Sequence, residues 1–244
     1  MGHRLLHYVA VIAILGTPAR ATECSLALIL ALDVSGSVNA SEDRLQREGV
    51  ASALLAAPVK AAFLERGPVA LFVFEWSMTS HQYPLMPGWQ IVNAEEDLLR
   101  VADAILASRR GAVARLNPPT AVGSALGYAA EALRNGPRCD ASTIDISGDG
   151  ENNDGFGPSV AYATYPLDDV TVNALVIGGA GEVHPFWDDA KLVAWFEAEV
   201  LRGPGAFAII ADGYGDYARA MEMKLLRELE LPIVSGWAAR DGAS

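Results

Sequence analysis

Three oxygen-bearing side chains follow a hydrophobic run near the start of the chain. The run at residues 26–32 ends at Asp33, and Ser35 and Ser37 follow at alternate positions. A continuous apolar run is typical of a buried parallel strand, and the ligands of open α/β sheets gather where such strands end. Carboxylate and hydroxyl oxygens are hard ligands that suit Mg²⁺ or Mn²⁺. Ser and Asp also cap helices, so residues 33–37 alone leave a metal site and a helix cap open.

Two later loops carry further oxygen side chains. Thr120 lies just before an Ala-rich helical segment, and Asp149 follows the apolar run at residues 142–147. If that run pairs with residues 26–32, both loops open at the same edge of the sheet as Asp33. The sequence then predicts one metal site at this edge, formed by Asp33, Ser35, Ser37, Thr120 and Asp149.

The elements that must position these loops alternate between strand and helix patterns. This alternation predicts an α/β fold: a Rossmann-like, doubly wound, mostly parallel six-stranded sheet with one short antiparallel edge strand and helices on both faces. The predicted strands are residues 26–32, 69–75, 142–147, 170–177 and 206–210, with a weak edge candidate at 82–86. The predicted helices are residues 41–57, 95–109, 121–134, a segment within 188–202, and 214–230.

The first 21 residues have the pattern of a cleaved secretory signal. His3 and Arg4 precede an apolar stretch at residues 5–15, and Ala19 and Ala21 are the small residues that a signal peptidase reads. That stretch is shorter than the roughly 20 residues of a membrane span, and no later segment comes closer. We therefore expect an exported protein, periplasmic or secreted, with no membrane span, no lipid anchor and a single domain at residues 22–244.

Charge and composition narrow the classes of partner. Loss of two arginines with the signal would change the formal charge from −12 to −14, and an acidic surface repels phosphate backbones. We therefore expect no nucleic-acid partner. Only His81 and His184 follow the signal, and with two distant cysteines they do not form a zinc site of the usual spacing.

The two cysteines of an exported chain favour a disulfide. Cys24 lies just before the first predicted strand and Cys139 just before the strand at residues 142–147. If those strands are parallel neighbours, about 4.8 Å apart, both cysteines lie at one end of the sheet within reach of a bridge. The alternative is two free buried thiols.

The spacing of the candidate site resembles a known family. Asp-x-Ser-x-Ser at residues 33–37, a distant Thr before a helix, and Asp149-Gly150 after a later strand resemble the metal-ion-dependent adhesion site (MIDAS) of von Willebrand factor A (vWA) domains. The resemblance covers nearly the whole mature chain. It is closest to an exported bacterial branch without assigned function, through residues 45–49, 75–76, 144–150 and 203–207. It implies that Ser35 and Ser37 bind the metal directly, Thr120 directly or through water, and Asp33 and Asp149 mainly through water or hydrogen bonds.

The donor set favours binding over catalysis. Neutral hydroxyls coordinate a divalent ion without neutralising it, and Mg²⁺ takes about six oxygens, so an exchangeable position remains for a carboxylate of a protein partner. We expect a non-enzymatic module that binds Mg²⁺, or Mn²⁺ or Ca²⁺. The alternatives are a metal-dependent hydrolase or phosphoryl-transfer enzyme, and an envelope scaffold with an idle metal site. Ser35 stands where phosphoryl-transfer aspartate motifs need a second acid, which argues against the enzyme.

Three further acidic features have open roles. Glu75 ends the second predicted strand, where it either reaches the outer shell of the metal or is a surface carboxylate. Asp145 lies inside a predicted buried strand and needs a partner there, so a structural hydrogen bond is favoured over metal ligation. Residues 152–154 resemble part of a calcium loop, but Asp154 occupies the glycine position and Val160 the final glutamate position, which excludes an EF-hand.

Overall fold

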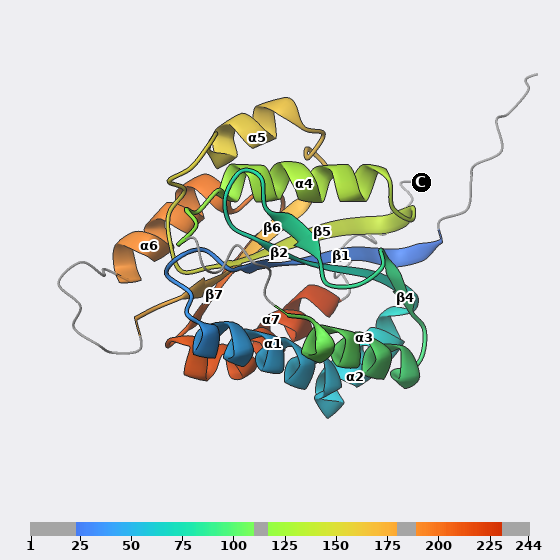
Figure 1. Cartoon of the computed structure of the whole chain (residues 1–244). Coiled ribbons are helices and arrows are strands. Elements are labelled where there is room, and N and C mark those ends of the chain that lie inside the picture. The colour runs from blue at the N-terminus through green and yellow to red at the C-terminus, as the bar shows by residue number, and fades with distance from the viewer. Residues whose placement is uncertain (1–22, 110–116, 180–188, 231–244) are drawn as a thin grey trace, which may run out of the picture.

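The computed structural model describes residues 23–109, 117–179 and 189–230, which form one sheet between two layers of helices (Figure 1). The strands are β1 (Cys24–Asp33), β2 (Val69–Trp76), β3 (Gln82–Pro84), β4 (Gln90–Val92), β5 (Cys139–Gly148), β6 (Thr171–Ile177) and β7 (Ala208–Ala211). The helices are α1 (Ala40–Leu55), α2 (Ala57–Arg66), α3 (Glu95–Ala107), α4 (Val122–Arg134), α5 (Pro158–Thr164), α6 (Asp189–Trp195) and α7 (Tyr217–Leu229). A π-helical turn (Phe196–Val200) follows α6, and a 3₁₀ turn (Tyr214–Asp216) precedes α7.

The sheet confirms the predicted α/β class and places β1 at its centre. The strand order is β3-β2-β1-β5-β6-β7, and β1 is parallel to both of its neighbours. The edge strand predicted at residues 82–86 is present as β3, antiparallel to β2. A seventh strand, β4, also pairs antiparallel with β2 and was not predicted, because three residues are too few to show a period.

Two helices, α2 and α5, were not predicted, and each has a proline in its first turn. Pro58 does not end α1 but lies in the first turn of α2, where its lack of an N–H group costs no helical hydrogen bond. Pro158 has the same position in α5. The helix predicted at residues 41–57 ended against Pro58, whereas α1 ends at Leu55 and α2 begins at Ala57.

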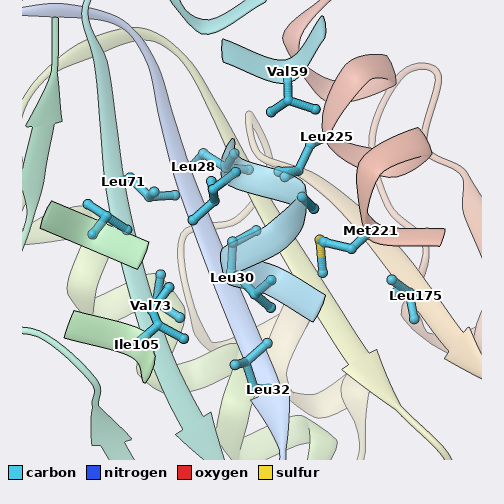
Figure 2. Packing of buried hydrophobic residues seen from close by; sticks show 14 of the residues in the cluster. Leu28, Leu30, Leu32, Val59, Leu71, Val73, Ile105, Leu175, Met221 and Leu225 are labelled. Atoms are coloured by element: carbon cyan, nitrogen blue, oxygen red, sulfur yellow. The ribbon is translucent and has the colours of Figure 1, made fainter. Parts of the chain in front are cut away.

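Alternate side chains of β1 point into two separate cores. Leu28, Leu30 and Leu32 pack with α1, α2, α3 and α7 on one face, and Figure 2 shows Met221 and Leu225 of α7 within that cluster. Ile29 and Ala31 pack with α4, α5 and α6 on the other face. Burial on both faces explains the unbroken apolar run. It fixes the direction of β1 and therefore the place where its polar end emerges.

The predicted disulfide is present between Cys24 and Cys139. The two residues are direct partners in the register of β1 and β5, with Cα atoms 4.5 Å apart. The bridge joins positions separated by 115 residues at the amino ends of the two central strands. It lies at the end of the sheet opposite to Asp33, and so holds the two strands that carry the candidate site without entering it.

The predicted signal at residues 1–21 lies outside the described residues, so it stays a prediction. Across residues 23–109, 117–179 and 189–230, no helix has the length and apolar character needed to cross a membrane.

Candidate metal site

The carboxyl ends of β1 and β5 bring the predicted site together. Asp33 is the last residue of β1, and Asp149 directly follows β5, its hydrogen-bonded neighbour. The turn after β1 is tied to the loop before α4, because the amide of Gly36 donates to the carbonyl oxygen of Pro118 over 2.7 Å. Thr120 lies two residues further along that loop. Three segments that are distant in sequence thus meet at one edge of the sheet.

A continuous hydrogen-bond chain links both serines to both aspartates. The backbone amide of Ser35 donates to Asp33 Oδ1 over 2.7 Å, and the Oγ atoms of Ser35 and Ser37 lie 3.1 Å apart. Ser37 Oγ donates to Asp149 Oδ1 over 2.6 Å. A carboxylate therefore orients the Ser37 hydroxyl, and the Ser35 hydroxyl contacts Ser37 in turn.

Asp33 is fully buried, and its Oδ2 has no hydrogen-bond partner among the described residues. Burial first, and the nearby charge of Asp149 second, raise the pKa of Asp33 to about 8. A buried acceptor without a donor is costly, and a cation or a cation-bound water beside it would remove that cost. This orphaned oxygen fits a metal ion, so the residues present suit the predicted ligand.

Asp149 is held by both of its oxygens. Oδ1 accepts from Ser37, and Oδ2 accepts from the Tyr214 hydroxyl over 3.1 Å. Burial raises the pKa of Asp149, whereas these two hydrogen bonds oppose the shift. Tyr214 belongs to the turn that leads into α7 and was missed, because nothing in its sequence surroundings links it to residue 149. The candidate site therefore contacts the start of the last helix directly.

Two asparagines fix the loop that carries Thr120. Asn153 Oδ1 accepts from the Thr120 amide over 2.7 Å, and the Asn153 amide donates back to the Thr120 carbonyl oxygen over 2.8 Å. Asn152 Oδ1 accepts from the Gly123 amide at the start of α4 over 3.1 Å. The asparagines that resemble a calcium loop therefore brace the neighbouring loop by these bonds.

A cavity of about 360 Å³ opens over the site. Ser37, Thr120 and Asp149 line it, with Asn117 and Asn153 at its wall. Gly150 also lines it, and a Cβ there would stand 3.6 Å from Thr120 Oγ1. Four of the five predicted site residues are 7 % exposed or less, and Ser37 is the exception, so the site is reached through this opening.

The structure contradicts one of the two interpretations of Glu75. Glu75 is not a surface carboxylate, because its side chain is fully buried and its Oε2 lies 2.5 Å from Arg47 Nη2. Arg47 also donates from Nε to Asp43 Oδ1 over 3.0 Å, and His81 Nε2 lies 3.0 Å from Glu75 Oε1. The partner of Glu75 is thus a cation from α1, and it neutralises a carboxylate beside the end of β1.

Asp145 has the partner that its burial requires. Its Oδ1 lies 3.0 Å from Lys224 Nζ, and Lys224 belongs to α7. The two side chains are 1 % and 0 % exposed. Asp145 therefore forms an internal ion pair away from the candidate metal site.

The raised pKa of Asp33 predicts how the metal-free protein responds to pH. The folded state holds this proton up to about pH 8, whereas the unfolded chain releases it near the ordinary value of 3.8. Folding then takes up a proton between those values, so stability should fall as pH rises from about 4 to about 8. Thermal unfolding in chelator across this range measures the slope. Asp33→Asn should make the slope less steep, while the raised pKa of Asp145, about 7, keeps part of it. An unchanged slope in that variant would contradict the assignment.

The site is built from hydroxyls as much as from carboxylates. Within the part of the chain that the structure describes, no three His, Cys, Asp or Glu side chains are grouped to hold a metal. Ser35, Ser37 and Thr120 supply neutral oxygens, and Asp33 and Asp149 supply the charge. This donor set suits a small hard cation such as Mg²⁺ rather than a soft one.

Comparison with known proteins gives a family and a fold. Residues 23–233 match a family described as "Protein of unknown function (DUF1194)". No curated protein matches the chain.

Several solved structures share the fold at low identity. A von Willebrand factor type A protein from Catenulispora acidiphila superposes with a TM-score of 0.57 and 13 % identity, over 84 % of this chain and 43 % of that one. Proximal thread matrix protein 1 from the mussel byssus gives 0.56 and 16 %, over 86 % and 49 %. Another structure of the mussel protein, described with a zinc-occupied MIDAS motif, gives 0.53 and 16 %, over 86 % and 49 %. The chain spans less than half the length of these proteins, and the likeness shows a vWA-like fold.

Proposed function

Since this chain belongs to the DUF1194 family and has a vWA-like fold, we propose that it is an exported, non-enzymatic module that binds a divalent cation and, through it, an acidic group of a protein partner. Asp33, Ser35, Ser37, Thr120 and Asp149 would hold the cation. The observation that carries the proposal is the buried Asp33 Oδ2, which has no hydrogen-bond partner among the described residues. Ser35, two residues further along, has its hydroxyl 3.1 Å from that of Ser37.

The cation would supply an electrophilic centre for a carboxylate. Ser35, Ser37 and Thr120 are neutral, so only the two aspartates would offset the two positive charges of the cation, in part or at longer range. Ser37 and Thr120 line the open cavity, which leaves that side of the site accessible to a partner. A carboxylate entering from the cavity would complete the coordination shell of the cation. The mussel protein, described with a zinc-occupied MIDAS motif, is an example of such a motif with a bound metal.

A binding role is preferred because of the side chains that line the cavity among the described residues. No His, Lys or Cys is among its described lining residues, and the single acid, Asp149, is held by Ser37 and Tyr214. General acid–base or nucleophilic catalysis needs a group that is free to exchange a proton or attack. The Cys24–Cys139 disulfide supports export to an oxidising compartment.

The test combines a metal titration with capture of partners from an envelope extract. Mg²⁺ alone should give saturable heat on titration, and partners should be captured with Mg²⁺ but not with chelator. Ser35→Ala should lose both signals. Ser25→Ala is the matched control, since its hydroxyl bonds to the Pro68 carbonyl oxygen at the opposite end of β1. Capture that is equal with Mg²⁺ and with chelator would contradict the proposal.

A further inference from the structure

A second buried polar cluster lies between the sheet and α7, away from the candidate metal site. Its members are Asp145 of β5 with Lys224 and Glu228 of α7, and their side chains are 1 %, 0 % and 0 % exposed. A lysine side chain is almost never fully buried, and here two carboxylates share it. The proposed function uses none of the three.

The lysine nitrogen touches both carboxylates. Nζ lies 3.0 Å from Asp145 Oδ1 and 2.5 Å from Glu228 Oε1. Asn173 Nδ2 also donates to Glu228 Oε1 over 3.1 Å, so this oxygen is fixed from two sides. The ring of Phe207 lies 4.9 Å from Nζ and covers it on another side. Lysine, aspartate and glutamate are thus held in one geometry without bulk water.

Burial raises the pKa of one member of this cluster, Asp145. Desolvation raises the pKa of Asp145 to about 7, Glu228 adds to the rise, and Lys224 opposes it. Proton transfer within the Lys224–Asp145 pair leaves an amine beside a carboxylic acid, which is the pair from which an amide forms. The contact at 3.0 Å meets the proximity that such reactions need.

The geometry points to an intramolecular isopeptide bond between Lys224 Nζ and Asp145 Cγ, formed with Glu228 as the proton carrier. The Nζ lone pair attacks Cγ of the protonated Asp145 carboxyl group, and Glu228 takes a proton from Nζ. Glu228 then returns this proton to the departing hydroxyl, the C–O bond breaks, and one water leaves as the C–N bond is completed. Both reactants belong to the chain, and nothing is oxidised or reduced.

Two features of the surroundings fit this reaction. Glu228 Oε2 has no hydrogen-bond partner among the described residues, so it is available to hold the transferred proton. Glu228, Asn173 and Phe207 also line a cavity of about 320 Å³ at the amino ends of β1, β5 and β6, which gives the water a way out. The bond would join β5 to α7 covalently across 79 positions of the sequence.

The buried cluster around Arg47 provides a contrast. Arg47 pairs with Glu75 and Asp43 at similar distances. A guanidinium stays protonated in proteins and is not a nucleophile, so the same burial cannot give an amide there. The chemical difference between the two clusters lies in the lysine.

Intact mass measurement of the folded, exported chain tests the bond. After reduction, its mass should be lower by about 18 Da, one water, than the mass expected from its sequence and its sequenced first residue. A tryptic digest should join residues 220–227 to residues 139–191, because trypsin does not cut after an acylated lysine. The full expected mass in the folded protein would overturn the inference.

Two variants distinguish this bond from other reactions that also release one water. Lys224→Arg keeps the positive charge and should have its full expected mass, so a loss of water that persists in it would overturn the assignment. Glu228→Gln keeps the shape but removes the proton carrier, and should also keep its full mass. Loss of water in Glu228→Gln would overturn the role given to Glu228. The unaltered chain alone decides whether the bond exists, even if a variant does not fold.

Discussion

Arg47→Ala should lower the free energy of unfolding by about 3–5 kcal/mol, the usual cost of removing one partner of a buried ion pair. Glu75 is fully buried and would lose the guanidinium that lies 2.5 Å from its Oε2. The change also removes bonds from Arg47 to Asp43 and Ser108. Urea unfolding followed by circular dichroism gives the difference. Metal affinity should change little, because the pair stands beside the site and not in it.

A neighbouring arginine provides the control. Arg44 lies on the same helix, and its pair with Glu48 is 3.9 Å long between side chains that are 65 % and 54 % exposed. Arg44→Ala should therefore cost less than about 1 kcal/mol. Equal losses for Arg44→Ala and Arg47→Ala would contradict the distinction between an exposed pair and a buried one.

Asp33→Asn should separate metal binding from stability. In the unaltered protein, saturating Mg²⁺ should raise the unfolding temperature, since a ligand that binds only the folded state stabilises it by about 2.7 kcal/mol at a hundred times its Kd. The variant should lose this response. Its metal-free stability should match or exceed that of the unaltered protein, because it no longer buries an ionisable carboxyl group whose pKa is raised to about 8 by burial. Thermal unfolding with Mg²⁺ and with chelator measures both effects.

Asp140→Asn is the matched control for this change. Asp140 lines the cavity at the amino ends of the strands, at the opposite edge of the sheet, so the metal response should remain. A full Mg²⁺ response in Asp33→Asn would remove Asp33 from the site.

The fold could be predicted from the sequence where an element is long and apolar. β1, β2 and β6 are buried and mostly apolar, so their places could be predicted. β5 was predicted to begin only at residue 142, because residues 139–141 are half-buried or exposed and carry no such run. Short elements that are stabilised by pairing with a distant segment could not be predicted. An example is β4, whose three residues pair with β2.

The candidate site was predictable in its residues but not in its supports. Asp33 ends β1 and Asp149 directly follows β5. The prediction assumed that these strands pair, and the structure contains that pairing. The partners of Asp149 and Asp145, namely Tyr214 and Lys224, lie 65 and 79 positions away on the last helical segment. Periodicity tells which face of a helix is buried, but not which strand end a polar side chain on that face will meet. Such long-range polar pairs need coordinates.

Residues 45–49, noted above for their resemblance, acquire separate physical roles. Gln46 Nε2 donates to the carbonyl oxygen of Asp33 over 2.9 Å, and Arg47 pairs with Glu75. A Cβ at Gly49 would stand 2.7 Å from the ring of Tyr217, so glycine lets α1 and α7 approach closely. One short stretch of α1 therefore holds the end of β1, the end of β2 and the start of α7.

The direct pairing of Cys24 with Cys139 has a consequence for assembly. β1 is made early but sits between two strands, and its second neighbour, β5, is synthesised more than a hundred residues later. Until then one edge of a long apolar strand is open to pairing with other chains. A slip of one residue between β1 and β5 would turn every side chain of one strand to the wrong face, and would move the two sulfur atoms out of line. Formation of this disulfide therefore selects the correct register, because it links β1 to β5 covalently only when these central strands are aligned.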